Sequence, residues 1–422
     1  MKVFPTFYTG DSLGWLDAFF TSTSAICVTG LIVVDTATYF TFAGQLYVLI
    51  LIQLGGLGML TFASVIITAL GGRPSLRSEM AIAGTRETRK IPARKIMVDI
   101  LKFTLICEAI GATALYLIWA PKIGWIEAIW PSIFHSVSAF CNAGFSTNTD
   151  SLMSHANSSA TLLVIACLII AGGIGFIVME ELALYFNNRT QRLKRISTHT
   201  KVVLITTAIL VILPCFCFAL FEWNRSLDGL STADKITNSI FLSVTPRTAG
   251  FNAIDYGKAS DSTNLLTILL MIVGGSPGST AGGLKTTTFM LLLLLAWSRL
   301  RGLRVAIFFD RSIPDNTIQQ AMGLFVIVSA LMTVGVFLTQ LFDDPFGDDP
   351  RIFQRVFEVV SAFNTVGLSM GITNQLNAGA KLTLILMMFV GRVGPLAVYT
   401  AFESRFTKRS DFRLANEDVI IG

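Results

Sequence analysis

Long apolar runs alternate with short polar segments along most of the chain. Seven of these runs come close to or exceed the roughly 20 apolar residues that cross the hydrocarbon core of a bilayer. The pattern therefore predicts seven membrane-spanning helices, at residues 43–70, 96–120, 160–186, 201–222, 264–299, 318–342 and 380–404. The fifth run is interrupted by GGSPGSTAGG at residues 274–283. A regular helix disfavours this stretch because it combines a proline with five glycines.

Four segments between the runs contain similar phrases, which are TSTSAICVTGL, SVSAFCNAGF, LSVTPRTAGF and VVSAFNTVGL. The phrases align on four glycines spaced about 110 residues apart, a self-similarity that indicates a structural repeat. The aligned glycines are Gly30, Gly144, Gly250 and Gly367. Three copies carry Ser-Ala six and five residues before the glycine, and the third copy has Val244-Thr245 there.

Each phrase lies between one predicted span and the next, in a segment too short and polar to cross a bilayer. We expect a re-entrant segment, in which a short helix descends part of the way and extended backbone returns, because such backbone is tolerated where it lines a water-filled path. Two spans per unit restore the side of the membrane, so the repeats are parallel and can surround an axis along its normal. The sequence thus predicts an all-α polytopic membrane protein with four parallel helix–re-entrant pore loop–helix repeats around one pore.

The repeat boundaries follow from this alignment. Repeats are expected at residues 1–70, 71–186, 187–300 and 301–404, followed by a cytoplasmic tail at 405–422. Repeat 3 contains the interrupted helix 264–299. Repeat 1 has only its pore loop and second helix, because MKVFPTFYTG stands where its first helix is expected. A truncated N-terminus and an alternative start both explain that missing helix.

Composition and charge support the membrane setting. Hydrophobic residues make up 53% of the chain and charged residues 14%, whereas a soluble domain has roughly a quarter charged residues. Lys and Arg gather in segments 71–95, 187–201 and 299–317 and in the tail, but segment 145–160 has none. The positive-inside bias makes the basic segments and the C-terminus cytoplasmic. Nucleic-acid or lipid binding is the alternative for these segments, but topology explains all four at once. Membrane lipid is expected as a partner because the chain spans a bilayer, and nucleic acid is not.

The four glycine-centred phrases suit a cation filter. A dehydrated alkali cation needs oxygen ligands, which rings of backbone carbonyls supply, and glycine reaches the backbone conformations that turn these carbonyls to one axis. A single glycine would indicate only a tight turn, but the set of four favours a filter. The predicted ion-binding residues are Val28, Thr29, Gly30, Asn142, Ala143, Gly144, Thr248, Ala249, Gly250, Thr365, Val366 and Gly367.

Two enzyme motifs partly match the interrupted run, but neither is expected to be functional. The nucleophile-elbow pattern G-x-S-x-G needs a strand-to-helix turn and a partner histidine. The phosphate-loop pattern needs its lysine directly after a glycine, and here Leu284 stands between them. No enzyme is therefore predicted, and the segment is expected to be an unwound part of a spanning helix below the filter. A membrane enzyme would need a convergent catalytic constellation, and a simple membrane anchor would not need four such glycines.

Three cations near membrane depth require a role, since such charges usually face a cavity or a partner. Arg247 is expected to brace the third phrase from behind, with Glu358 or Asp17 as its partner. Lys285 is ambiguous between a gate element and a snorkelling residue. Arg392 lies in the middle of the last predicted span, where a helix-packing ion pair is the alternative to a pore-facing position.

With these motifs the chain resembles the SKT superfamily of potassium transporters, which includes the Trk, Ktr and HKT membrane subunits. TSTSAICVTGL, FHSVSAFCNAGFS, TPRTAGFN and SAFNTVGLS are most similar to the ion-conducting membrane subunit of the Ktr branch, and the resemblance covers essentially the whole chain. It implies potassium uptake across the bacterial inner (cytoplasmic) membrane, with sodium as a coupling or activating ion. The alternative is a sodium-permeable or purely channel-like member. A serine at the first filter glycine goes with sodium permeation in this superfamily, so Gly30 favours potassium.

The same resemblance implies partners and a gate. It implies a homodimer and a cytosolic ring of RCK-type nucleotide-binding subunits, so that a nucleotide would act only through that partner. It also implies that Arg392 faces the pore and contacts a gating loop. The implied gating residues are Gly274, Gly275, Ser276, Pro277, Gly278, Ser279, Thr280, Ala281, Gly282, Gly283, Lys285 and Arg392.

Overall fold

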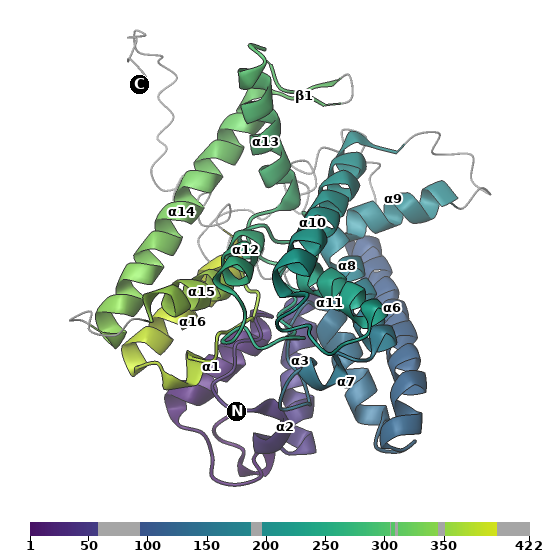
Figure 1. Ribbon diagram of the computed structural model, residues 1–422, viewed down its shortest axis with the longest axis vertical. Coiled ribbons are helices and arrows are strands. Elements are labelled where there is room, and N and C mark those ends of the chain that lie inside the picture. Colours follow the sequence, from purple (N-terminus) through teal and green to yellow (C-terminus); the bar gives the residue numbers. More distant parts are fainter. Residues whose placement is uncertain (58–92, 187–195, 304, 309–310, 345–350, 395–422) are drawn as a thin grey trace.

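The computed structural model describes residues 1–57, 93–186, 196–303, 305–308, 311–344 and 351–394. Within these ranges the chain is mostly helical, and three helices are long and apolar enough to cross a membrane. They are α6 (Ala93–Ile123), α10 (Thr198–Glu222) and α14 (Asp315–Asp343), which agree with the predicted spans 96–120, 201–222 and 318–342. Figure 1 shows α14 on one side of the bundle and α6 on the other.

The other predicted spans are built from shorter pieces. The last predicted span begins as α16 (Ala378–Val393), and the first as α3 (Phe42–Leu57). The interrupted fifth span consists of α12 (Asp261–Ile272) and α13 (Thr286–Leu300), joined by non-helical residues 273–285. Residues 58–70 and 395–404 of the first and last predicted spans lie outside the described residues, as do most of the basic segment 71–95 and the tail 405–422.

The span predicted at 160–186 consists of two helices rather than one straight helix. The chain forms α8 (Ser159–Ile174) and α9 (Phe176–Phe186), which meet at an angle of 100°. The break is at Gly175, whose φ of 96° and ψ of 141° are outside the helical region. Glycine adopts such a conformation without the steric cost that a side chain brings. Counted as one bent pair, α8 and α9 give a fourth candidate span within the described residues.

Four short helices carry the repeated phrases. They are α1 (Trp15–Ile26), α7 (Ile129–Phe140), α11 (Thr232–Val244) and α15 (Ile352–Phe363). Ser231 caps α11 by accepting a hydrogen bond from the backbone N–H of Asp234, which satisfies one of the free amides of the first turn. A non-glycine residue with positive φ follows two positions after the end of α1, α7 and α15 and four positions after the end of α11.

The remaining elements are small. Three 3-10 turns, η1 (Pro5–Phe7), η2 (Met153–His155) and η4 (Thr373–Gln375), and the one-turn helix α2 (Thr36–Tyr39) lie in connecting segments. Two strands, β1 (Ile307–Phe308) and β2 (Arg311–Ser312), pair antiparallel after α13. This hairpin departs from the all-α prediction, which took residues 299–317 only as a basic loop.

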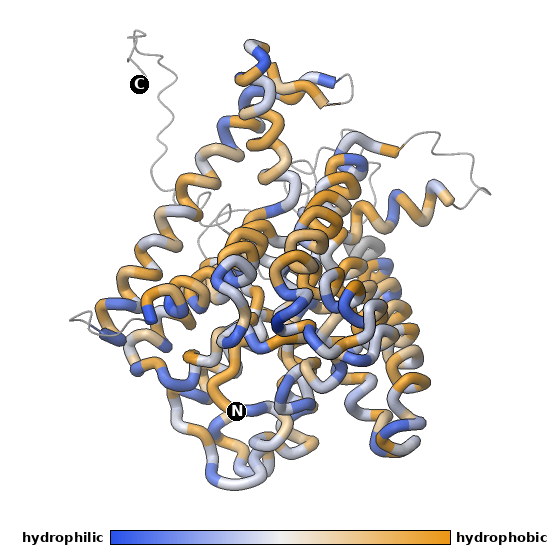
Figure 2. The backbone as a smooth tube through the Cα atoms, in the orientation of Figure 1, coloured by the Kyte–Doolittle hydropathy of each residue, from blue (hydrophilic) through white to orange (hydrophobic). Residues whose placement is uncertain are grey.

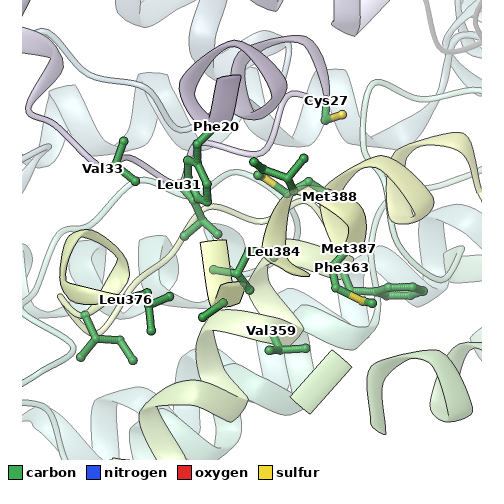
Figure 3. Close-up of a cluster of buried hydrophobic side chains, with 14 of the residues drawn as sticks. Phe20, Cys27, Leu31, Val33, Val359, Phe363, Leu376, Leu384, Met387 and Met388 are labelled. Atoms are coloured by element: carbon green, nitrogen blue, oxygen red, sulfur yellow. The ribbon is translucent and has the colours of Figure 1, made fainter. Parts of the chain in front are cut away.

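Four apolar clusters among the described residues extend from one quarter of the molecule into the next. One cluster joins α1 to α15 and α16 through Phe20, Leu31, Phe363 and Met388 (Figure 3). Comparable clusters join α3 to α7, α8 to α11, and α12 to α15. The last quarter therefore packs on the first, and the four quarters close on one another.

The outer surfaces of the long helices are apolar. Ile212, Leu213 and Phe216 on α10 and Val326 and Phe337 on α14 are all more than half exposed, and Figure 2 shows hydrophobic residues along both helices. Because large exposed apolar faces are unusual on soluble proteins, these faces suit contact with lipid.

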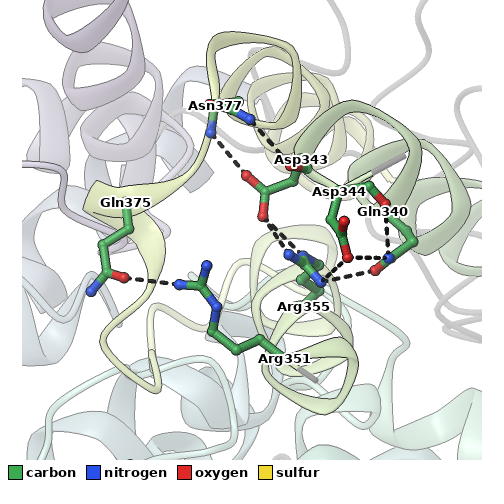
Figure 4. A network of polar contacts seen from close by, with 7 residues as sticks. All are labelled: Gln340, Asp343, Asp344, Arg351, Arg355, Gln375 and Asn377. Carbon is green, nitrogen blue, oxygen red and sulfur yellow. Dashed lines mark hydrogen bonds and ion pairs between the residues drawn. The ribbon is translucent and has the colours of Figure 1, made fainter. Parts of the chain in front are cut away.

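A buried ion pair fixes one end of the fourth short helix. The Arg355 guanidinium on α15 lies 2.8 Å from the Asp343 carboxylate at the end of α14 and donates to the Gln340 side chain (Figure 4). The same carboxylate accepts from the backbone N–H of Asn377, just before α16. Helices α14, α15 and α16 are thereby held together at one point.

Candidate ion pathway

The four aligned glycines form a closed ring, with each one in contact with the next quarter. A Cβ atom added at Gly30 would lie 3.2 Å from the Cα of Gly144, and the corresponding distances are 3.0 Å from Gly144 to Gly250, 3.1 Å from Gly250 to Gly367 and 3.0 Å from Gly367 back to Gly30. At each position the added atom would lie still closer to the neighbouring carbonyl oxygen, from Ala143, Ala249, Val366 or Thr29. We call these four glycines, with the two residues before each, the glycine ring.

The backbone of the ring repeats one unusual conformation. The four glycines have φ between 71° and 94°. Two residues before each glycine, Val28, Asn142, Thr248 and Thr365 also have positive φ, between 49° and 69°. Valine and threonine rarely adopt such angles, so the packing around the ring must hold them there. With this backbone conformation each glycine lies against a carbonyl oxygen of the next quarter.

Hydroxyl groups of the short helices hold the ring in place. Ser24 accepts a hydrogen bond from the backbone N–H of Gly30 at 3.1 Å, and Ser361 accepts one from Gly367 at 3.0 Å. In the other two quarters, Ser138 and Thr245 donate to the carbonyls of Phe145 and Phe251, both at 2.7 Å. The Ser-Ala pairs of the sequence repeat thus supply the braces of the ring, and Thr245 takes the place of the missing serine.

Buried oxygen atoms near the ring have no partner among the described residues. They include the hydroxyls of Thr29 and Thr365 and the amide oxygen of Asn364. Buried polar atoms without a hydrogen-bond partner are uncommon in proteins. Together with the neighbouring carbonyl oxygens they make the surroundings of the ring rich in oxygen atoms.

Residues 273–285, the central loop, lie against one side of the ring. A Cβ added at Gly283 would lie 2.9 Å from the Asn364 side chain, and one added at Gly274 would lie 3.3 Å from that of Thr248. The Thr280 hydroxyl donates to the carbonyl of Phe140 at 3.1 Å. The predicted gating residues 274–283 are therefore brought into contact with the second, third and fourth quarters.

The loop is also tied to its own ends. Gly274 donates from its N–H to the Leu284 carbonyl, and Thr286 donates to the Gly275 carbonyl. The Lys285 ammonium donates to the Ala281 carbonyl at 2.8 Å, so this lysine is turned toward the loop. These hydrogen bonds hold the loop in a compact conformation.

Arg392 connects the loop to two helices. It is almost fully buried on α16 and donates to the Thr280 carbonyl of the loop at 2.6 Å and to the Gly55 carbonyl of α3 at 2.5 Å. Both are hydrogen bonds to backbone, and no ion pair of Arg392 occurs among the described residues. Among the described residues, Arg392 thus makes hydrogen bonds to backbone carbonyls instead of the helix-packing ion pair that the sequence left open.

The partners predicted for Arg247 are wrong. Glu358 accepts instead from the hydroxyls of Ser369 and Thr373, and Asp17 pairs with Lys381 at 2.9 Å. Arg247 is buried and lines a small cavity together with Val244 and residues of α8. Local hydrogen bonds from residues close in sequence satisfy Glu358 more readily than a distant arginine.

Glu108 is a residue that the sequence reasoning missed. It is buried on α6, where its carboxylate lies 3.4 Å from the Gln53 amide nitrogen and 3.8 Å from the Cys141 sulfur, one residue before the ring. A carboxylate inside the apolar run 96–120 is itself a signal, because ionisable residues at membrane depth are costly and usually functional.

Comparisons with known proteins agree on one family. Residues 2–410 match the family described as TrkH: Cation transport protein. The chain is 38% identical to "Ktr system potassium uptake protein B" of Bacillus subtilis and 37% identical to "Potassium/sodium uptake protein NtpJ" of Enterococcus hirae, in each case over 98% of this chain and 91% of the relative.

A solved structure gives the same result at the level of fold. The crystal structure of the potassium transporter TrkH from Vibrio parahaemolyticus superposes with a TM-score of 0.72 at 20% identity, covering 94% of this chain and 79% of that one. On the family match and the two relatives, this chain belongs to the TrkH family of cation transport proteins.

Proposed function

We propose that this protein takes up potassium across the bacterial cytoplasmic membrane, and that the glycine ring is its selectivity filter. The observation that carries the proposal is the closed cycle of contacts from Gly30 through Gly144, Gly250 and Gly367 back to Gly30. Carbonyl oxygens gathered from four quarters can replace the hydration shell of an alkali cation. The names of the relatives, which refer to potassium uptake, support potassium as the ion.

In this proposal the ring discriminates through its lack of side chains. Each glycine leaves no space for a Cβ beside the neighbouring carbonyl oxygen, so the spacing of the oxygens is set by backbone alone. Sodium enters as a coupling or activating ion, which the name of the Enterococcus hirae relative supports. That same name favours the alternative function, a pore that admits sodium as well.

The central loop is the proposed gate. An ion that leaves the ring on the side of Thr248 and Asn364 meets the loop, and Arg392 holds the loop there by its bond to the Thr280 carbonyl. Lys285 and Arg392 add positive charge at this point, which opposes the passage of a cation until the loop moves.

The proposed assembly is a homodimer with a cytosolic ring of RCK-type subunits, through which a nucleotide acts. Support comes from the relatives named as components of a Ktr system. The four-repeat organisation, the boundaries at 70, 186, 300 and 404, and a cytoplasmic C-terminus are part of the same proposal, and the contacts between successive quarters support it.

Potassium and sodium fluxes into liposomes containing the protein test this function. We expect potassium flux to exceed sodium flux under the same driving force, and Gly30→Ser to reduce potassium flux and the preference for potassium by at least about tenfold, because a side chain would displace the Ala143 carbonyl. The control is Gly10→Ser, since an added Cβ at Gly10 meets nothing within 4 Å. Potassium flux that is unchanged by Gly30→Ser would contradict the filter assignment.

A further inference from the structure

The break between α8 and α9 is bonded directly to the central loop. Because α8 ends at Ile174, its last carbonyls have no helical partner. Gly173 and Gly172 use theirs to accept from the backbone N–H groups of Ser276 at 2.9 Å and Thr280 at 3.2 Å, and Phe176, the first residue of α9, donates its N–H to the Gly278 carbonyl at 3.1 Å. Three backbone hydrogen bonds in two directions thus join the break to the loop.

The backbone of the central loop is also closely packed against the break between α8 and α9. A Cβ added at Gly175 would lie 2.7 Å from the Pro277 carbonyl oxygen, and one added at Gly278 would lie 3.7 Å from the Ile177 side chain on α9. The loop therefore cannot shift far from the pathway unless these hydrogen bonds break or α9 moves with it.

The other part of α9 is fixed to α10. The Glu181 carboxylate accepts hydrogen bonds from the N–H and hydroxyl of Ser197 and from the hydroxyl of Thr200. Figure 1 shows α9 extending away from the bundle beside the end of α10 that begins at residue 198. The Glu181 carboxylate therefore ties to α10 a helix whose first residue is bonded to the loop.

The Glu181 carboxylate is not needed to cap α10. The Ser197 hydroxyl already accepts a hydrogen bond from the N–H of Thr200 at 3.2 Å and caps the helix by itself. Glu181 adds a connection between two helices, which a cap does not need.

We propose that α9 is a lever that couples the cytoplasmic face of the protein to the central loop, and that Glu181 is the positioning residue that holds the lever in the blocking arrangement. This inference rests on the proposed function, because it requires the loop to be the gate. Movement of α9 away from α10 pulls on the loop through Phe176 and Gly278 and frees the pathway. Coupling of this kind needs a bistable element that both sites bias, and the α8–α9 break provides the hinge.

The test compares potassium flux into liposomes for Glu181→Gln and Glu180→Gln. Glu180 is the adjacent, exposed residue on the same helix. We expect Glu181→Gln to raise potassium flux by about two- to thirtyfold, the range that residues acting on a coupled element produce, with an unchanged potassium-to-sodium ratio, and Glu180→Gln to match the unmodified protein. Thr200→Val, which removes one donor and keeps Glu181, is expected to raise flux in the same direction if Glu181→Gln does not fold.

The double variant Glu181→Gln with Arg392→Gln tests the lever separately from the proposed function on which it rests. Arg392→Gln releases the loop on its other side, so Glu181→Gln should add little in that background if both act through the loop. If the double variant shows the product of the two single effects on flux, the lever is contradicted. The lever also fails if Glu181→Gln and Thr200→Val leave flux unchanged while Arg392→Gln alters it. Both outcomes are compatible with the loop as the gate. If neither Arg392→Gln nor Gly30→Ser alters flux, the proposed function itself fails.

Discussion

At the scale of single residues, the glycine ring is held by hydrogen bonds from hydroxyl groups. The sequence repeat contains these residues but does not reveal what they bond to. The recurring Ser-Ala pair is recognisable from sequence, and the structure shows that the serines bond to the ring or to the residue after it. Where the third copy departs from the pattern, Thr245 supplies the hydroxyl from one position later.

Substituting Ser24 by Ala tests this brace. The change leaves the buried N–H of Gly30 without its acceptor, which costs about 1–3 kcal/mol and loosens one quarter of the ring. We expect a lower potassium-to-sodium flux ratio and weaker stabilisation of the protein by potassium in thermal unfolding. Ser22→Ala is the matched control on the same helix, since Ser22 bonds only to groups away from the ring, in Met1 and Ala18. A ratio that Ser24→Ala leaves unchanged would show that the brace does not set selectivity.

Residues that act through distant partners were harder to predict. The four glycines could be aligned by sequence alone, and Arg392 was expected to contact the loop, as its bond to Thr280 shows. The partners of Arg247 and the cluster of Glu108 with Gln53 depend on which helices are neighbours in space. Sequence without an alignment does not contain that information, so Glu358 was assigned to the wrong partner.

At the scale of elements, the two broken runs differ in how visible their breaks are. The run 264–299 contains Pro277 and five glycines, which exclude a regular helix from sequence alone. The run 160–186 has three glycines near its centre, at positions 172, 173 and 175, but no proline, and each glycine costs a helix only about 1 kcal/mol. The bend at Gly175 is instead selected by the backbone bonds to the central loop, which are tertiary contacts.

Substituting Gly175 by Ala tests the importance of that bend. Its φ of 96° and the nearby Pro277 carbonyl both oppose a side chain, so we expect a loss of about 1–3 kcal/mol in stability and a change in basal potassium flux, because the loop is displaced. Gly323→Ala on α14 is the control, since an added Cβ there meets nothing within 4 Å and helix propensity favours alanine. The melting temperature should fall for the first variant and hold or rise for the second. Equal melting temperatures and fluxes would mean that the bend tolerates a side chain.

At the scale of the whole molecule, the four quarters share their cores. Because four of the apolar clusters extend across the junctions between quarters, each quarter buries part of its apolar surface against its neighbours. The glycine ring is the innermost part of the same arrangement, since each glycine contacts the next quarter. Stability and ion binding are therefore expected to depend on each other.

The junction between the last and first quarters is the place to measure this dependence, because the chain does not connect them directly. Met388 on α16 is fully buried there and packs near Cys27 and Leu31 of the first quarter (Figure 3). Met388→Ala should cost about 2–5 kcal/mol. A ligand that binds only the folded state raises stability by mass action, so a distorted ring will show a smaller increase in melting temperature with added potassium.

The matched control for this prediction is Leu386→Ala on the same helix, because Leu386 is about half exposed on the outer surface. We expect Met388→Ala to lower both the melting temperature and its dependence on potassium, and Leu386→Ala to change neither by much. If Met388→Ala lowers the melting temperature but keeps the full potassium dependence, the junction stabilises the fold without shaping the ring. Coupled losses would instead mean that closing the four quarters and forming the ion site are one event.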